Sequence, residues 1–199
     1  MIKNIVFDMG NVLLDYNPEV ILNKACTSEE EKNVIRKELF EGPEWILGDK
    51  GEMTNADRFE PVSKRIPECM HKALLECVEH WDICMTPQPG AKEFLEKVRK
   101  AGYHTFVLSN AADNFYEYFP KEYDMEAFEG VVVSCDLLLL KPDHEIYEYL
   151  LKTYNLAPNE CLFIDDREDN VQGAKGCGMQ AVRFENNYDA IWDFLQKQS

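Results

Sequence analysis

Groups that could carry out phosphoryl chemistry stand at the ends of short apolar runs in this sequence. Asp8 ends one such run, Ser109 ends a second, Asp165 ends a third, and Lys141 follows a further run after a short apolar stretch. A carboxylate can act as a nucleophile and form a covalent phosphoryl intermediate. An ammonium group and a hydroxyl can hold phosphoryl oxygens and stabilise the charge that develops on them.

The acidic residues in this set also predict a metal site. Asp8, Asp165 and Asp166 would repel one another if they converged without partners, and their pKa values would rise. Mg²⁺ relieves this repulsion, because it binds one or two carboxylates together with water and substrate oxygens. Lys141 would add a second positive charge, and the Ser109 hydroxyl and the backbone N–H of Asn110 would donate hydrogen bonds.

The apolar runs themselves predict the fold. They are short, rich in β-branched and aromatic residues, and apolar at consecutive positions, which is typical of strands buried on both faces. They lie near residues 5, 107, 132, 163 and 182. Helical patterns lie between the later ones, at 89–101 and 144–156 and, shorter, at 170–178. This alternation predicts an α/β fold with a doubly wound, mainly parallel sheet, in which the chemical groups above meet at the carboxyl ends of the strands.

A long insertion separates the first two strands. It spans roughly 90 residues, far more than an ordinary crossover needs. It contains helix-start signals at Thr27–Glu30 and Thr54–Asp57, and a helical pattern after Pro67. We therefore expect an α/β core made of residues 1–14 and 88–199 and an inserted helical cap made of residues 15–87.

Bulk composition excludes several function classes. The chain has 199 residues, 21 Lys and Arg against 37 Asp and Glu, and a formal charge of −16, so it repels nucleic acid and anionic membranes and we expect neither as a partner. No apolar run reaches the length of a membrane span, and the first residues have no targeting pattern. The seven scattered cysteines fit reduced thiols in a cytoplasmic protein, and the oligomeric state stays open.

Four motifs in order resemble those of the haloacid dehalogenase-like (HAD) hydrolases. They are "FDMGNVLL", "VLSNA", "LKPDHEIYEYLL" and "FIDDREDNVQGAKGCGM", and together with the cap they cover essentially the whole chain. The arrangement is similar to subfamily I of that superfamily, and its details resemble the branch of α-D-glucose-1-phosphate phosphatase. The resemblance implies a Mg²⁺-dependent phosphatase acting on a small phosphorylated metabolite.

The resemblance also implies individual roles. Asp8 would be the nucleophile, and Ser109 and Lys141 would bind phosphate beside Asn110. Mg²⁺ would be held by Asp8, the carbonyl of Gly10 and Asp166, with Asp165 beside them. Asn170 falls where the family often keeps a polar supporting residue. Asp169 could be either such a supporting residue or an exposed surface residue.

Gly10 is the departure from the family pattern. Family members usually carry a second aspartate there, which protonates the leaving alcohol and later activates water. Such help is worth about 10²–10⁴-fold in rate, and glycine supplies none of it. Either the leaving group is good, as the anomeric oxygen of a sugar 1-phosphate is, or another residue such as Asp15, Asp49 or His80 substitutes.

Two other functions are compatible with Gly10. A metal-independent 2-haloacid dehalogenase also lacks this aspartate, although the Asp165–Asp166 pair favours the metal-dependent phosphatase. A catalytically weak phosphate-binding or regulatory protein is the other alternative. In the cap, "FEGPEWILGDKGEMT" resembles the turn that faces the active site, and Trp45 is the expected contact for a sugar ring.

Overall fold

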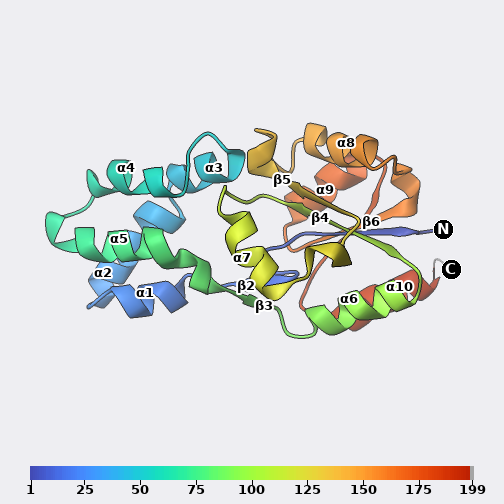
Figure 1. Ribbon diagram of the computed structural model, residues 1–199, viewed down its shortest axis with the longest axis horizontal. Coiled ribbons are helices and arrows are strands. Elements are labelled where there is room, and N and C mark those ends of the chain that lie inside the picture. Colours follow the sequence, from blue (N-terminus) through green and yellow to red (C-terminus); the bar gives the residue numbers. More distant parts are fainter. Residues whose placement is uncertain (198–199) are drawn as a thin grey trace.

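A computed structural model describes residues 1–197 and contains the expected parallel sheet. Five strands lie in the order β5-β4-β1-β6-β7, and each neighbouring pair is parallel. The α/β fold with an inserted helical region is confirmed (Figure 1). The strands of this sheet are β1 (Asn4–Phe7), β4 (His104–Ser109), β5 (Gly130–Val133), β6 (Cys161–Asp165) and β7 (Gln180–Arg183).

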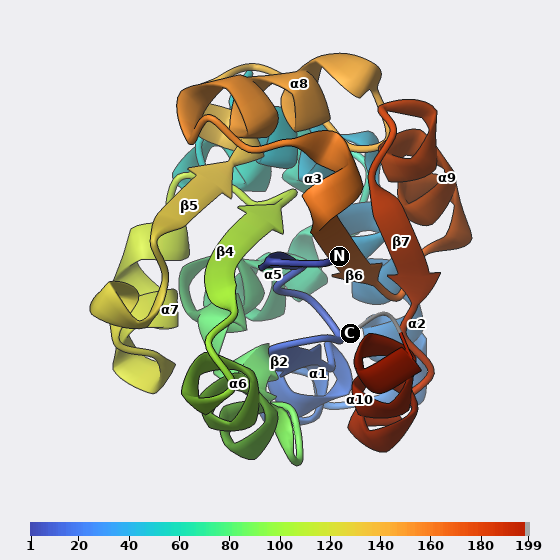
Figure 2. The same ribbon diagram turned by 90° about the vertical axis from the view of Figure 1, so that its right-hand side faces the viewer.

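Helices cover both faces of the sheet (Figure 2). The apolar side chains of α8 (His144–Thr153) and α9 (Glu168–Gly176) pack on one face. Those of α6 (Ala91–Lys100), α7 (Phe115–Glu122) and α10 (Tyr188–Lys197) pack on the other. Burial on both faces explains why the strands read as continuous apolar runs. Within residues 1–197, no helix has the length and apolar character required to cross a bilayer.

The insertion forms a separate group of helices beyond the sheet, at the left of Figure 1. Its α-helices are α1 (Glu19–Ala25), α2 (Glu29–Ile35), α3 (Pro43–Lys50), α4 (Phe59–Ser63) and α5 (His71–His80). Two short antiparallel strands, β2 (Leu14–Tyr16) and β3 (Met85–Pro87), lie where the chain leaves and returns. The division into a core and a cap made of residues 15–87 stays a prediction. Both predicted boundaries lie in this pair of strands.

The carboxyl ends of the central strands point toward the inserted helices (Figure 1). Asp8 directly follows β1, Ser109 is the last residue of β4, and Asp165 is the last residue of β6. Because β1 pairs with both β4 and β6, these positions are neighbours across the sheet.

The inserted helices contact the core close to that edge. The hydroxyl of Ser134, after β5, donates a hydrogen bond to the carbonyl of Asp49 at the end of α3. Gly51 follows with φ +81°, and a methyl group there would overlap the carbonyl of Cys135. The backbone N–H of Asn55 donates to Asp113 Oδ1 at 3.0 Å. The end of α3 is therefore fixed against the core rather than free above it.

Candidate active site

Asp8 is the central carboxylate of the site. It is 7% exposed, and its backbone N–H donates to the carbonyl of Ile164 in β6 at 2.9 Å. The backbone N–H of Met9 donates to Asp8 Oδ1 at 2.7 Å, which fixes the carboxylate just beyond the strand. Burial raises the pKa of Asp8 to about 8; Lys141 opposes this shift, and Asp165 and Asp166 add to it.

Lys141 lies between two buried carboxylates. Its Nζ is 2.7 Å from Asp8 Oδ1 and 2.7 Å from Asp165 Oδ2. Burial alone would lower the pKa of Lys141, but Asp165 and Asp8 outweigh it and raise the pKa above its ordinary value. The lysine therefore keeps its positive charge inside the protein.

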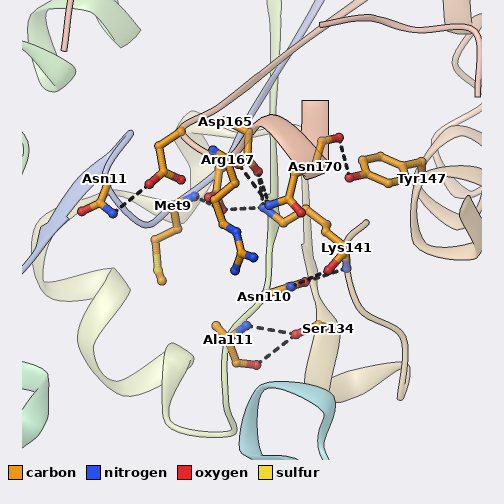
Figure 3. A network of polar contacts seen from close by, with 12 residues as sticks. Met9, Asn11, Asn110, Ala111, Ser134, Lys141, Tyr147, Asp165, Arg167 and Asn170 are labelled. Atoms are coloured by element: carbon orange, nitrogen blue, oxygen red, sulfur yellow. Dashed lines mark hydrogen bonds and ion pairs between the residues drawn. The ribbon is translucent and has the colours of Figure 1, made fainter. Parts of the chain in front are cut away.

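Asp165 is fully buried and fully engaged. Its oxygens accept hydrogen bonds from Asn170 Nδ2, at 3.0 Å to each, and from the backbone N–H of Arg167 at 2.9 Å. Figure 3 shows these contacts around Lys141. Asn170 thus supports Asp165, at the place where the sequence predicted a polar supporting residue, whereas Asp169 is exposed.

The acidic groups can hold a divalent cation. One carboxylate oxygen from each of Asp8, Asp165 and Asp166 lies within 4.8 Å of the others. Asp166 Oδ2 accepts a hydrogen bond from Asn11 Nδ2 at 2.9 Å, which orients it. Within residues 1–197 the ammonium paired with carboxylates of this cluster is that of Lys141, so the cluster has an excess of negative charge that Mg²⁺ would balance.

Ser109 and Asn110 occupy the end of β4 in different ways. Ser109 is fully buried, and within residues 1–197 its hydroxyl has no hydrogen-bond partner, although it does not line the cavity. Asn110 does line the cavity, but its side-chain amide is bonded to the backbone of Lys141 in both directions. The Asn110 side chain therefore positions Lys141.

A cavity of about 380 Å³ opens between these residues and the inserted helices. Asp8, Gly10, Asp166 and Lys141 line its sheet side. The opposite side is mostly aromatic and apolar, and is made by Tyr16, Trp45, Ile46, Trp81, Met85 and Tyr118.

Trp45 belongs both to this aromatic wall and to the packing of the inserted helices. Its ring centroid lies 4.9 Å from that of Trp81, 5.2 Å from Phe40 and 5.8 Å from Tyr16. The half-buried ring is therefore held in place while part of it faces the cavity.

One acidic residue stands on the cap side of the cavity. Asp49, whose side chain is 20% exposed, lies 3.9 Å from Nη2 of the fully buried Arg58. Arg58 also lies over the Trp45 ring, with its guanidinium carbon 4.2 Å from the centroid. Burial raises the pKa of Asp49 to about 7, although Arg58 and Lys141 lower it.

Comparison with known proteins identifies the family. A model of haloacid dehalogenase-like hydrolases matches residues 2–178. The chain belongs to this family. The hydrolase is 25% identical over 195 residues to a sesquiterpene phosphatase from Aspergillus oryzae, covering 98% of this chain and 95% of that protein. It is 26% identical over 210 residues to a D-ribitol-5-phosphate phosphatase from Bacteroides thetaiotaomicron, covering 95% of each.

Solved structures share the fold. A HAD family enzyme from Bacteroides thetaiotaomicron, in complex with magnesium and inorganic phosphate, has a TM-score of 0.71 at 22% identity and covers 94% of this chain and 96% of that chain. L-2-haloacid dehalogenase from Xanthobacter autotrophicus has a TM-score of 0.65 at 21% identity and covers 92% and 77%. Both a phosphate-binding enzyme and a dehalogenase thus share this architecture.

The three residues considered as substitutes for the missing aspartate lie in different places relative to the cavity. Asp49 lines the cavity together with Asp8. Asp15 lies in β2 and lines a neighbouring pocket instead, and His80 is exposed at the end of α5.

Several residues of the site were not predicted from the sequence. Asn11, which orients Asp166, directly follows Gly10 in the first motif, so its position was a usable signal. Arg167, which lines the cavity, directly follows the acidic pair. Arg58 and Ser134 had no such signal, because they reach the site only through the packing of distant segments.

Proposed function

We propose that this hydrolase is a Mg²⁺-dependent phosphatase that cleaves a small phosphomonoester through an aspartyl-phosphate on Asp8. One observation carries the proposal: Asp8, Asp165 and Asp166 converge beside Lys141 at one edge of the sheet. An excess of carboxylates suits a metal-bound phosphate, whereas displacement of halide by a carboxylate requires no metal.

The residues of the chain divide the work. The Asp8 carboxylate attacks phosphorus, and the P–O bond to the leaving alcohol breaks as the new bond forms. Lys141 orients the nucleophile at 2.7 Å and offsets the charge on the transferring group. Ser109 contributes a hydroxyl without a partner in the described chain, and the backbone of Asn110 adds an N–H donor beside it.

Asp8, the carbonyl of Gly10 and Asp166 would hold the metal ion, with Asp165 close by. When bound, Mg²⁺ would neutralise charge on the phosphoryl group and on the carboxylates. Asn11 and Asn170 would keep Asp166 and Asp165 in place through their side-chain amides.

A sugar phosphate is the proposed substrate, with α-D-glucose 1-phosphate first. Its anomeric oxygen is a better leaving group than a simple alcohol, which suits a site with glycine at position 10. The Trp45 ring beside the cavity supports this choice, because an aromatic face stacks well on a sugar ring. The resemblance to the α-D-glucose-1-phosphate phosphatase branch points the same way.

A second substrate class has support from the same wall. The aromatic wall of the cavity is made by Tyr16, Trp45 and Trp81 from the inserted segment and by Tyr118 from α7, and it would also cover an apolar chain. This second class is an isoprenoid monophosphate, and the similarity to a sesquiterpene phosphatase supports it.

The test is phosphate release from a panel of esters, with Mg²⁺ and with EDTA. The panel holds α-D-glucose 1-phosphate, glucose 6-phosphate and farnesyl monophosphate. We expect Mg²⁺-dependent release that is fastest from the 1-phosphate, and its loss in Asp8→Asn with folding intact by circular dichroism. Metal-independent release of halide from 2-chloropropionate would support the dehalogenase. Phosphate binding without turnover on any ester would support a binding or regulatory protein.

A further inference from the structure

We propose that Asp49, delivered from the inserted helices, is the general acid and base that Gly10 cannot supply. This inference rests on the proposed phosphatase function and deepens it. It assigns the proton that must reach the leaving oxygen.

In-line displacement fixes where an acid must stand. The attacking and leaving oxygens lie on opposite sides of phosphorus. With Asp8 on the sheet side of the cavity, the leaving oxygen points toward the inserted helices. An acid on that side can reach it, whereas another group beside Asp8 on the floor of the cavity would have to reach around the phosphate.

Asp49 is the carboxyl group in that position. Among the described residues that line the cavity, the carboxylates are Asp8, Asp166 and Asp49, and the first two belong to the nucleophile and metal cluster. The other groups in the wall that can titrate, Tyr16 and Tyr118, have pKa values that burial raises far above neutrality. Asp49 is thus the cap-side group that can both give and take a proton near neutral pH.

The surroundings of Asp49 leave its carboxyl free for substrate. Its carboxylate makes no hydrogen bond within residues 1–197, and its nearest charged contact is Arg58 Nη2 at 3.9 Å. This distance is longer than a hydrogen bond. The guanidinium therefore lowers the pKa of Asp49 by its charge but leaves the carboxylate oxygens free to contact substrate. A carboxyl whose pKa lies near the operating pH is suited to both halves of the reaction.

The backbone of Asp49 is held by a link to the phosphate loop. The Ser134 hydroxyl donates to the Asp49 carbonyl and accepts a hydrogen bond from the backbone N–H of Ala111 at 2.9 Å. Ala111 directly follows Asn110, so one hydroxyl joins the loop after β4 to the end of α3. Figure 3 shows Ser134 beside Ala111 at the lower side of the polar network.

The proton balance is complete with residues of this chain and water. In the first step the Asp49 carboxyl gives its proton to the leaving oxygen as the bond from phosphorus to Asp8 forms, which releases the alcohol. In the second step water enters the same position and attacks phosphorus. The Asp49 carboxylate takes the water proton, inorganic phosphate leaves, and the Asp8 carboxylate is restored.

The test compares a leaving group that needs a proton with one that does not. Wild type, Asp49→Asn and the control Asp15→Asn are assayed with Mg²⁺ on p-nitrophenyl phosphate and on the faster of glucose 1-phosphate and glucose 6-phosphate. We expect Asp49→Asn to lower kcat on the glucose ester by at least roughly 10²-fold. The rate of the initial burst of p-nitrophenol from Asp49→Asn should stay within a few-fold of wild type. Asp15→Asn should change neither this rate nor kcat on the glucose ester.

Several results would overturn the assignment while leaving the phosphatase in place. One is an equal loss on both esters, which would mean that Asp49 only supports the fold beside Arg58. Others are no loss at all, or a wild type that hydrolyses the aryl ester but neither glucose phosphate. Turnover of no ester by wild type would instead overturn the proposed function, and this inference with it.

A measurement on wild type keeps the inference testable should Asp49→Asn fail to fold. Above about pH 7 both monoesters are predominantly dianions. The ratio of kcat/KM for the glucose ester to that for the aryl ester then cancels ionisations shared by both reactions, including those of Asp8 and Lys141. The ratio should fall as Asp49 ionises beside Arg58 and Lys141, and a flat ratio up to pH 9 would overturn the assignment.

Discussion

Asn110 and Lys141 are joined by two hydrogen bonds that close a ring. The Asn110 side chain donates to the carbonyl of Lys141 at 3.0 Å and accepts from its backbone N–H at 2.9 Å. Asparagine is suited to this task, because its amide offers one donor and one acceptor side by side. The end of β4 thereby sets the place of a lysine that comes 31 residues later.

Removal of this link should loosen the ammonium between its carboxylates. We expect Asn110→Ala to lower kcat/KM by at least roughly tenfold and to lower the free energy of unfolding, at about 1 kcal/mol for each lost hydrogen bond. Steady-state kinetics and thermal melting measure the two effects. The control is Asn4→Ala at the opposite end of β1, which removes a buried amide that is bonded to Glu160 and Cys161. Asn4→Ala should lower stability alone, and an equal kinetic loss in both variants would contradict the prediction.

Metal binding should stabilise the folded protein. A ligand that binds only the folded state adds about 2.7 kcal/mol when its concentration is 100 times its Kd. Titration with Mg²⁺ should therefore raise Tm, and EDTA should reverse the rise. In Asp166→Asn the midpoint should move to at least roughly tenfold higher Mg²⁺, because an oxygen ligand with full charge is lost. Asp169→Asn, an exposed aspartate three residues away, should keep the wild-type midpoint, and a shift in this control would remove the assignment to Asp166.

The ionisation of Asp49 should cost stability. Its pKa is about 7 in the folded protein against 3.8 for an ordinary aspartate, so the folded state holds more protons between those values. The free energy of unfolding should therefore decrease from about pH 4 to about pH 7 through this residue, and then level off. The charged and titratable groups around it are Arg58, Lys141, Tyr16, Tyr118 and Cys135.

Asp49→Asn isolates this contribution, since all other groups titrate in both proteins. The Tm of the variant minus that of wild type should be more positive at pH 8 than at pH 5. Thermal melting at the two pH values, without Mg²⁺, measures the difference. The opposite sign would mean that the carboxylate is stabilised in the folded state, as a strong ion pair with Arg58 would require.

The contact between the end of α3 and the core can be tested with a pair of glycines. Gly51 and Gly102 both have positive φ, +81° and +90°, so alanine costs roughly 1–2 kcal/mol of backbone strain at either. A methyl group at Gly51 would overlap the Cys135 carbonyl, whereas nothing lies within 4 Å at Gly102. We expect Gly51→Ala to lose more stability than Gly102→Ala and, in addition, to lower kcat on the glucose phosphate. Equal kcat values in the two variants would show that the contact between the end of α3 and the core does not affect turnover.

Gly10→Asp should supply the aspartate that family members usually carry. Nothing lies within 4 Å of a methyl group at Gly10, and Gly10 lines the cavity, so the Cβ of an introduced aspartate has room. We expect it to raise the rate on glucose 6-phosphate more than on glucose 1-phosphate, because the poorer leaving group gains more from protonation. Equal gains on both esters would contradict the leaving-group argument. In the Asp49→Asn background the same substitution should restore much of the lost kcat.

The sequence predicted the sheet well because burial on both faces leaves a local signature. The strands β1, β4, β5, β6 and β7 each coincide with an apolar run, and the confirmed fold follows from them. The convergence of Asp8, Lys141, Asp165 and Asp166 followed from the same strand assignments, since parallel strands bring their carboxyl ends to one edge. Their catalytic roles stay predictions.

The remainder was hidden because it depends on contacts between distant segments. Helix α3 buries Glu44 and Gly48 rather than an apolar stripe, so periodicity gave no sign of it. Arg58 is fully buried although arginine is ordinarily exposed, and Gly48 supplies the space for it. Helices α7 and α10 were not predicted either, and α7 contains Pro120, a residue that ordinarily interrupts a helix.

The open space beside Gly10 also bears on how such enzymes diverge. Two of the glycine codons become aspartate codons by a single nucleotide change, and at Gly10 an added Cβ meets nothing within 4 Å. A lineage with a proton donor in its lid could gain a second one next to the nucleophile, and afterwards lose the first, without passing through an inactive ancestor. The residue at position 10 would then indicate whether a given descendant takes its proton donor from the lid or from the segment next to the nucleophile.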